Sequence, residues 1–258
     1  MRPCWGARHL LAARLPCGPG RRRLSVYRTM AKLKQTMQAY PDWTPHYTET
    51  ATCPLILKVD MATAFISAVF ANYEAGWINL RCLKKHDGDR PKFGKLNTRT
   101  NTWIWEHWFP LVETVADPSH LIGVAFAAEC YGYNVYVGAL PRGRHGEARK
   151  SSIYMAGVAW AELDFDKQGG EAETLRKAEA THPDILVHSG GGLHLYWVLK
   201  SPIPMTAETA RTFELALKSR QRKLGADAVH DITRILRPAG LSNFKYDPPR
   251  PVRLLKCP

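Results

Sequence analysis

Three absences limit what this 258-residue chain can be. No run approaches the roughly 18 uninterrupted apolar residues that a membrane-spanning helix needs, and the longest candidate, residues 121–140, contains Glu129, Asn134 and glycines. The six cysteines form no C-x-x-C pair, which argues against a zinc knuckle or a disulfide framework and is compatible with a reducing cytosol. No internal repeat is visible. With 45% hydrophobic residues, the sequence predicts a globular protein with one large domain or two small ones.

Acidic residues are missing from one end of the chain. The first 41 residues contain nine Lys or Arg and no Asp or Glu, which leaves 27 Lys or Arg against 23 Asp or Glu in the rest. This composition is typical of a disordered arm. The arm has three open interpretations: a nucleic-acid-binding tail, an Arg-rich targeting peptide, or an overlong gene start with true initiation at Met30. We place residues 1–54, the basic leader and a proline-containing linker, outside the fold.

Residues 55–258 predict an α+β fold in which helices cover mostly antiparallel strands. We divide them into an N-terminal unit, about 55–150, and a second unit, about 151–258, that holds the chemically informative motifs. The expected helices are 61–73, 119–130, 171–180, 205–223 and 231–236. The expected strands are 76–83, 134–141, 156–165, 185–189, 193–199 and 251–255. Three tryptophans near an apolar run, Trp103, Trp105 and Trp108, are expected to pack rather than to stack on bases.

The stretch "AWAELDFDKQGG", residues 159–170, places two carboxylates at alternate positions. Residues two apart in a strand face the same side, so Asp164 and Asp166 are predicted to point together. Two like charges held this close repel each other, and a divalent metal between their oxygens relieves the repulsion. A solvated strand end is the alternative interpretation.

The stretch "VHSGGGLHLYWVLK", residues 187–200, contains three consecutive glycines followed by His194. Glycines between two strands predict a tight hairpin, or a place where another backbone or a ligand approaches closely. An imidazole at the start of the second strand is a candidate ligand-binding group. A histidine satisfied within the core is the alternative.

The stretch "DAVHDITRILRPAGLSNFKYDPPRPVRLL", residues 227–255, mixes one carboxylate with several cations. On a short helix Asp231 and Arg234, with Arg237 and Lys245 beyond, would form a site suited to a metal-bound polyphosphate. Asn243 lies in a turn, where side-chain and backbone donors can add to a phosphate site. Solvated charge on a helix face is the alternative.

Four blocks occur in a fixed order between about Asn134 and Leu255: "NVYVGALPRGR", "AWAELDFD", "HSGGGLHLYWVL" and "DITRILRPAGLSNFK", the last followed by "RPVRLL". In these blocks the chain resembles the archaeo-eukaryotic primase superfamily, most closely its RepB-like primase and primase-polymerase members found on plasmids, phages and integrated elements. The fold that this resemblance implies is a mostly antiparallel RRM-like sheet with flanking helices, joined to an N-terminal α/β unit. One departure is "RPAGL", where the family usually reads Arg-Leu-Pro-Gly-Thr, so the proline is displaced by one position.

The resemblance implies a set of site residues. Asp164 and Asp166 match the metal-binding acidic pair, and Asp231 matches a third carboxylate of a centre that holds two Mg²⁺ or Mn²⁺ ions. His194 matches the histidine that contacts the triphosphate of the incoming nucleotide. The other nucleotide-binding positions implied are Ser189, Arg234, Arg237, Asn243 and Lys245.

The implied activity is that of a DNA primase or primase-polymerase, which adds NTPs or dNTPs on a single-stranded DNA template during replication of a mobile element, in the cytoplasm of a bacterial host. A basic loop is expected to contact the template or the nucleotide through Arg142, Arg144, Arg149 and Lys150. Relatives often continue into a helical primase region or a helicase, so a replicative helicase is an expected partner, and a membrane is not.

Two other functions remain open. One is a replication-initiator or nucleic-acid-binding module with a degenerate active site, and the other is a metal-dependent nuclease, whose carboxylate pairs look alike in sequence. A relaxase is disfavoured, because its histidine pair alternates on a strand whereas His188 and His194 are six residues apart.

Overall fold

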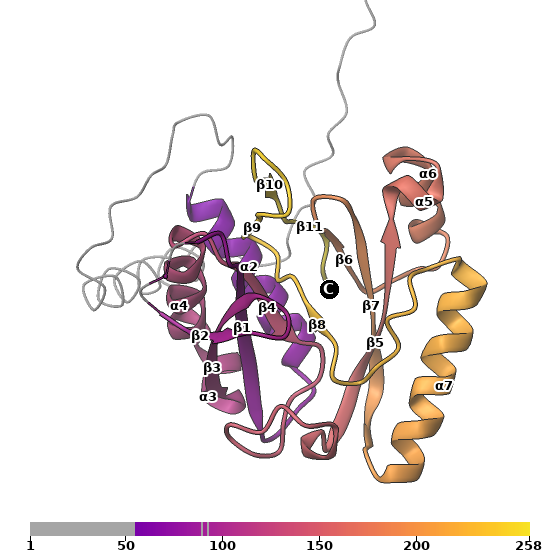
Figure 1. Ribbon diagram of the computed structural model, residues 1–258. Coiled ribbons are helices and arrows are strands. Elements are labelled where there is room, and N and C mark those ends of the chain that lie inside the picture. Colours follow the sequence, from indigo (N-terminus) through magenta and orange to yellow (C-terminus); the bar gives the residue numbers. More distant parts are fainter. Residues whose placement is uncertain (1–54, 89, 92) are drawn as a thin grey trace, which may run out of the picture.

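The computed structural model describes residues 55–258 apart from residues 89 and 92 (Figure 1). The expectations for the basic leader and linker, residues 1–54, lie outside the described residues. The described chain forms a five-stranded sheet of order β2-β3-β1-β4-β8, a four-stranded sheet of order β11-β6-β7-β5 and a two-stranded ribbon of β10 and β9. Every strand pair is antiparallel, so the predicted α+β class with antiparallel strands is confirmed.

The five-stranded sheet has one covered face and one open face. Its strands are β1 (Trp77–Lys85), β2 (Lys95–Asn97), β3 (Thr102–Pro110), β4 (Asn134–Gly138) and β8 (Ile235–Leu236). Three helices lie on its covered side, α2 (Leu55–Phe70), α3 (Leu111–Ala116) and α4 (Ser119–Cys130). Alternation along β1 buries Ile78, Leu80 and Cys82 against these helices and turns Arg81 and Leu83 to the open face.

The four-stranded sheet carries the second half of the chain. Its strands are β5 (Met155–Asp164), β6 (Ile185–His188), β7 (Gly192–Pro204) and β11 (Arg253–Lys256). The associated helices are α5 (Phe165–Gln168), α6 (Glu171–Glu179) and α7 (Ala207–Leu224), and α7 lies along the β5 edge of the sheet in Figure 1. Helix α7 begins at a capping box between Thr206 and Thr209 and ends at Gly225, whose φ of 62° suits a residue without a side chain.

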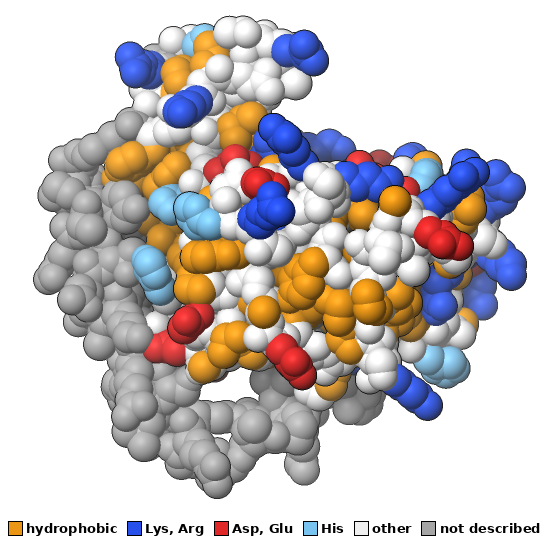
Figure 2. Space-filling model, turned by 90° about the horizontal axis from the view of Figure 1, so that it is seen from below, with side chains coloured by type: hydrophobic (Ala, Val, Ile, Leu, Met, Phe, Trp, Pro, Cys, Tyr) orange, Lys and Arg blue, Asp and Glu red, His pale blue; other side chains and the backbone are white. Residues whose placement is uncertain are grey.

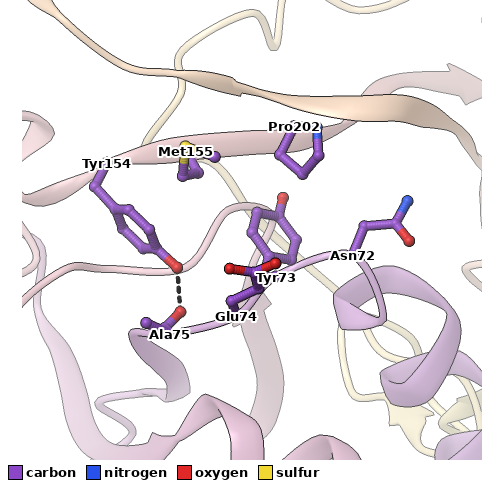
Figure 3. Close-up of a pocket in the computed structure, with 7 residues that line it drawn as sticks. All are labelled: Asn72, Tyr73, Glu74, Ala75, Tyr154, Met155 and Pro202. Atoms are coloured by element: carbon purple, nitrogen blue, oxygen red, sulfur yellow. Dashed lines mark hydrogen bonds between the residues drawn. The ribbon is translucent and has the colours of Figure 1, made fainter.

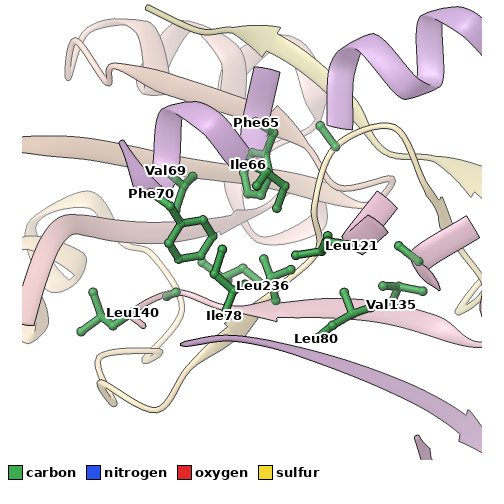
Figure 4. Close-up of a cluster of buried hydrophobic side chains, with 14 of the residues drawn as sticks. Phe65, Ile66, Val69, Phe70, Ile78, Leu80, Leu121, Val135, Leu140 and Leu236 are labelled. Atoms are coloured by element: carbon green, nitrogen blue, oxygen red, sulfur yellow. The ribbon is translucent and has the colours of Figure 1, made fainter. Parts of the chain in front are cut away.

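One hydrophobic core joins the two sheets. Phe65, Ile66 and Phe70 of α2 pack against Ile78 and other apolar side chains of the five-stranded sheet (Figure 4), and the same cluster includes residues of β5, β6 and β7. Each fully buried side chain of this size stabilises the fold by roughly 1.5–3 kcal/mol. Because the sheets share this core, residues at their common boundary hold fixed positions relative to one another.

The expected packing of tryptophan side chains is confirmed for Trp103 and Trp105. Trp103 and Trp105 are buried at 7% and 9% exposure, and the Trp105 ring stacks on Phe93 at 4.8 Å between centroids. Trp108 is half-buried and lies 6.1 Å from the His145 ring. These tryptophans therefore mainly pack, as expected.

The expected helix at 231–236 is wrong. Residues 232 and 233 form a turn, and Ile235–Leu236 form β8, which pairs with β4. The charged spacing suggested a helix, but the backbone of this segment instead bonds to neighbouring strands: the Ala139 amide donates to the Arg234 carbonyl at 2.8 Å. Tertiary pairing overrides the local pattern.

Several boundaries also differ from the expectation. Strand β7 continues to Pro204 rather than ending at 199, β4 ends at Gly138 rather than 141, and α2 spans Leu55–Phe70 rather than 61–73. The strand predicted at 156–165 ends at Asp164, and Phe165 begins α5. The strand predicted at 251–255 is divided into β10 (Arg250–Pro251), which pairs with β9 (Ser242–Asn243), and β11, which pairs with β6. Val252 lies between β10 and β11, and its amide donates to the Leu241 carbonyl at 2.7 Å.

Within the part of the chain that the structure describes, no helix is both long enough and apolar enough to cross a membrane.

Candidate active site

Two carboxylates stand on one face at the end of β5. The same face carries Val158 and Trp160 in the core, then Glu162 and Asp164, because residues two apart in a strand share a face. Asp164 Oδ1 accepts a hydrogen bond from the Asp166 amide at 2.9 Å and so caps α5. The expectation that Asp164 and Asp166 share a strand face is therefore wrong: Asp166 lies in α5 with an exposed side chain.

The alternating pair on the strand is Glu162 and Asp164. Sequence reasoning missed Glu162, although "AELDFD" contains two equally spaced acidic pairs, and only the end of the strand decides between them. The Glu162 side chain is 17% exposed, so it lies at the edge of the core rather than in open solvent.

His194 of β7 lies directly opposite Glu162. Its Nε2 is 3.8 Å from Glu162 Oε2, and the residue is 4% exposed. Burial, together with the positive charges of Arg237 and Arg234, lowers the pKa of His194 to about 4, although Glu162 and a backbone hydrogen bond to Arg237 oppose the shift. The imidazole is therefore neutral at pH 7, so its approach to Glu162 is a contact between a carboxylate and a neutral ring.

Two arginines, Arg234 and Arg237, lie close to Glu162 and His194. Arg234 Nε donates to Glu162 Oε1 at 2.7 Å. Arg237 donates to the Tyr136 hydroxyl at 2.7 Å and to Asn134 Oδ1 at 3.2 Å, and its guanidinium lies 4.7 Å from the centre of the Tyr136 ring. Burial lowers the pKa of Arg237, but the guanidinium stays protonated. Two fixed cations thus stand next to the carboxylates of β5.

The segment that carries these arginines crosses from one sheet to the other. At its start the Asp227 amide donates to the Glu162 carbonyl at 2.9 Å, and near its end the Arg234 carbonyl accepts from the amide of Ala139, the residue directly after β4. Asp231 lies between, exposed, with Oδ1 accepting from the Thr233 amide at 2.8 Å. The crossing holds Arg234 and Arg237 at the boundary of the sheets.

The glycine turn lies beside Asp164 and is tightly covered. A side chain on Gly192 would come within 2.1 Å of the Leu163 carbonyl oxygen, and one on Gly191 within 2.0 Å of the Tyr246 hydroxyl. Both predictions for these glycines are confirmed, because they form the turn between β6 and β7 and another backbone segment approaches them closely.

Ser189 and Asn243 meet at this turn. Asn243 Nδ2 donates to the Ser189 carbonyl at 2.8 Å, and the Ser189 hydroxyl donates to the Gly192 carbonyl at 3.1 Å. Both residues are buried, and Asn243 Oδ1 also accepts from the Lys245 amide at 3.0 Å, so the Asn243 side chain fastens β9 and the start of the following loop to the turn. Lys245 is exposed on that loop, with Nζ 5.9 Å from the centre of the Tyr246 ring.

The structure brings some of the predicted site residues together and leaves others apart. Asp164, His194, Arg234 and Arg237 lie around Glu162 and the glycine turn. Among residues 55–258, positions 89 and 92 aside, no three His, Cys, Asp or Glu side chains form a group able to hold a metal, so Asp231 does not close a cluster with Asp164 and Asp166.

The donor set nevertheless suits one class of ion. Mg²⁺ takes oxygen ligands and is commonly bound by one or two carboxylates together with substrate phosphates, rather than by a cage of protein ligands. Glu162 and Asp164 supply such a pair. The residues present therefore fit a divalent cation that arrives with a phosphate-bearing substrate.

The expected basic loop is only partly a surface feature. Arg142 is 1% exposed and donates to the carbonyls of Leu140, at 3.1 Å, and Thr233, at 3.4 Å. Burial lowers its pKa to about 10. The expectation that Arg142 contacts a template is therefore wrong, because its side chain is enclosed by the protein.

The other three basic residues of this loop remain at the surface. Arg144 lies 3.5 Å from Glu147, Lys150 lies 2.6 Å from Glu214, and Arg149 is exposed. Their role as template contacts stays a prediction. Figure 2 shows a further group of Lys and Arg side chains on the side where α7 lies.

No protein-family model matches this sequence, and no curated protein matches it. Among solved structures, the chain is similar to the AEP domain of the primase-polymerase of cyanophage S-2L, with 15% sequence identity and a TM-score of 0.49. The match covers 78% of this chain and 89% of that one. At this level of similarity the match does not establish a family or an activity.

A separate pocket lies at the other end of β5. Its volume is about 290 Å³, and Figure 3 shows Asn72, Glu74, Tyr154 and Pro202 among the residues that line it, with the Tyr154 hydroxyl donating to the Ala75 carbonyl. Met155 at this pocket and Glu162 are seven residues apart on the strand, or roughly 23 Å at 3.3 Å per residue. The pocket contains none of the predicted site residues.

Proposed function

We propose that this protein is a template-directed nucleotidyltransferase of the primase-polymerase type, which adds NTPs or dNTPs to a strand on a single-stranded DNA template. The observation that carries the proposal is the placement of Glu162 and Asp164 on one strand face, opposite the buried neutral His194 and within reach of Arg234. Phosphoryl transfer requires mainly positioning and charge stabilisation, and this site supplies both. The motif order described from the sequence supports the same assignment.

Each side chain has a distinct role in this proposal. Glu162 and Asp164 hold the metal, and Asp166 and Asp231 remain the additional carboxylates suggested by the sequence. A divalent ion, Mg²⁺ or Mn²⁺, supplies Lewis-acid activation of the attacking hydroxyl and neutralises phosphate charge.

The basic and neutral groups act on the triphosphate. Arg234 and Arg237 place two positive charges beside the carboxylates, where negative charge grows on the leaving pyrophosphate. His194 is neutral and buried against Glu162, so it adds no charge to the site, and its contact with a phosphate stays a prediction from the sequence. Buried Asn243, which donates to the Ser189 carbonyl, holds the start of the loop that carries Lys245. The exposed Lys245 side chain is proposed to contact a phosphate.

The test is incorporation of labelled NTPs and dNTPs on circular single-stranded DNA, with Mg²⁺ or Mn²⁺, with and without an annealed primer. Glu162→Gln and Asp164→Asn are expected to abolish incorporation, and Asp166→Asn tests the assignment that the sequence alone suggested. The matched control is Glu173→Gln, which removes a carboxylate from an exposed ion pair with Arg176 on α6 and is expected to leave incorporation unchanged.

The outcomes separate the functional classes. Product without a primer indicates a primase, and product only with a primer indicates a polymerase. Strand cleavage without incorporation would favour a metal-dependent nuclease, and binding of DNA without either reaction would favour a nucleic-acid-binding module. Full activity in both Glu162→Gln and Asp164→Asn would refute the proposed site.

A further inference from the structure

A groove lies over β1, β2 and β3 on the open face of the five-stranded sheet, the face turned away from α2 and α4. Its volume is about 540 Å³, and its lining includes Arg81 of β1, Lys95 and Asn97 of β2, and Ile104 and Glu106 of β3. Residues directly opposite one another in paired strands share a face, so these side chains project from the same side of the sheet. The proposed active site does not include this groove.

A row of side chains links the groove to the proposed active site. Glu106 lies opposite Arg81, and Arg81 lies opposite Tyr136 of β4. Leu236 of β8 pairs with Val137, which brings the next residue, Arg237, beside Tyr136, where the two side chains are hydrogen-bonded. Three strand spacings of about 4.8 Å make this row about 14 Å long, close to the length of four nucleotides at 3.4 Å each.

The chemistry of the groove suits a single nucleic-acid strand. Among the described residues of β1, β2 and β3, the open face of the sheet carries Arg81, Lys85 and Lys95 against one carboxylate, Glu106, and Ile104 is partly exposed there. Cations can follow a phosphate backbone, while apolar and aromatic side chains such as Ile104 and Tyr136 offer surfaces to unstacked bases.

Arg81, a cation within this row, can change partners. Arg81 Nε is 3.0 Å from Glu106 Oε1, and about a third of each side chain is exposed. An exposed pair of this kind is weak, so a phosphate can replace or share the carboxylate.

We infer that this groove holds the single-stranded DNA template and directs it along the Glu106–Arg81–Tyr136 row to Arg237. The inference rests on the proposed function, because the strand that it places in the groove is the template of that reaction. The groove and the leader, residues 1–41, both carry excess positive charge, so charge disfavours the leader as the occupant and favours a polyanion.

The experiment measures binding of a fluorescently labelled 20-nucleotide oligo-dT by anisotropy across a salt series, with the full chain and without nucleotides or metal. The double variant Arg81→Gln/Lys95→Gln removes two groove cations. Its matched control, Lys218→Gln/Arg222→Gln, removes two exposed cations from α7, on the other sheet. Thermal unfolding of each variant verifies that the fold is intact.

Removal of two phosphate contacts is expected to flatten the slope of log affinity against log salt by about 1.4 and to weaken binding by about 25-fold at 0.1 M salt. Glu106→Gln is expected to tighten binding, since it frees Arg81. The α7 variant is expected to bind like the wild type. A groove variant with wild-type affinity and slope, or an α7 variant that weakens binding more than the groove variant does, would overturn the inference.

Failure of the groove and failure of the proposed function give different results. Because binding is measured without nucleotides, it can be repeated in the Glu162→Gln/Asp164→Asn background. Loss of binding in the groove variant, with no incorporation by the wild type, would support the groove and refute the function. Primer extension by the wild type, with unchanged binding and extension by the groove variant, would support the function and refute the groove.

Discussion

Acid is expected to destabilise this protein through His194. The side chain is buried opposite Glu162 of β5, and this burial, together with the positive charges of Arg237 and Arg234, lowers its pKa from an ordinary 6.5 to about 4. Between these two values the unfolded chain binds a proton that the folded chain does not, so the stability from the neutral ring is complete above pH 6.5 and is lost as the pH falls. The two pKa values give a loss of about 2 kcal/mol by pH 5 and about 3 kcal/mol at full protonation.

The assay is urea denaturation at pH 7.5, 6.5, 5.8 and 5.0, followed by the fluorescence of the eight tryptophans. His194→Gln keeps a polar side chain but cannot take up this proton, so the difference in unfolding free energy between wild type and variant isolates His194 from other histidines. Measurement stops at pH 5 because carboxylates titrate below it. The wild type is expected to lose about 2 kcal/mol more than the variant between pH 7.5 and 5.0. Equal losses would refute a buried, neutral His194.

Three further changes test individual contacts. Arg142→Met is expected to lower the urea midpoint, because the buried Leu140 carbonyl loses its donor at about 1 kcal/mol or more and the half-buried Thr233 carbonyl also loses one. The salt dependence of DNA binding is expected to stay unchanged, whereas loss of a template contact would reduce it. Gly191→Ala is expected to destabilise the fold by displacing the Tyr246 hydroxyl, and Tyr246→Ala is expected to restore part of that loss in a double-mutant cycle of unfolding free energies. Asn243→Leu is expected to cost about 1–3 kcal/mol in a urea titration, because it leaves the buried Ser189 carbonyl without this donor.

Strongly periodic segments were predictable from the sequence. The helices at 119–130, 171–180 and 205–223 agree with α4, α6 and α7 to within two residues at each end. Their boundaries follow from local chemistry, such as the capping box at Thr206 and Gly225 after α7. The strands at 185–189 and 193–199 are present as β6 and β7, joined by a short turn that contains glycines, but β7 continues five residues beyond the expected end, to Pro204.

The segment 231–236 was not predictable from local pattern. Asp231 and Arg234 have the spacing of a helical pair, and nothing nearby in sequence shows that the Arg234 carbonyl accepts a hydrogen bond from Ala139, 95 residues earlier. The same long-range pairing buries Arg142 beneath the segment, where its guanidinium reaches the Thr233 carbonyl. In the sequence Arg142 resembles its exposed neighbours, so its burial depends on the fold alone.

The site itself shows how a one-position uncertainty in a strand end changes a functional assignment. "AELDFD" offers two acidic pairs, and the strand selects Glu162 and Asp164 because Asp164 turns the chain into α5 by accepting the Asp166 amide. Cross-strand register then places His194 opposite Glu162 rather than opposite Asp166. The crossing segment contributes Arg234 to the same carboxylate. A site assembled from two strands and one crossing segment therefore requires the register of β5 and β7, which the order of motifs along the chain does not contain.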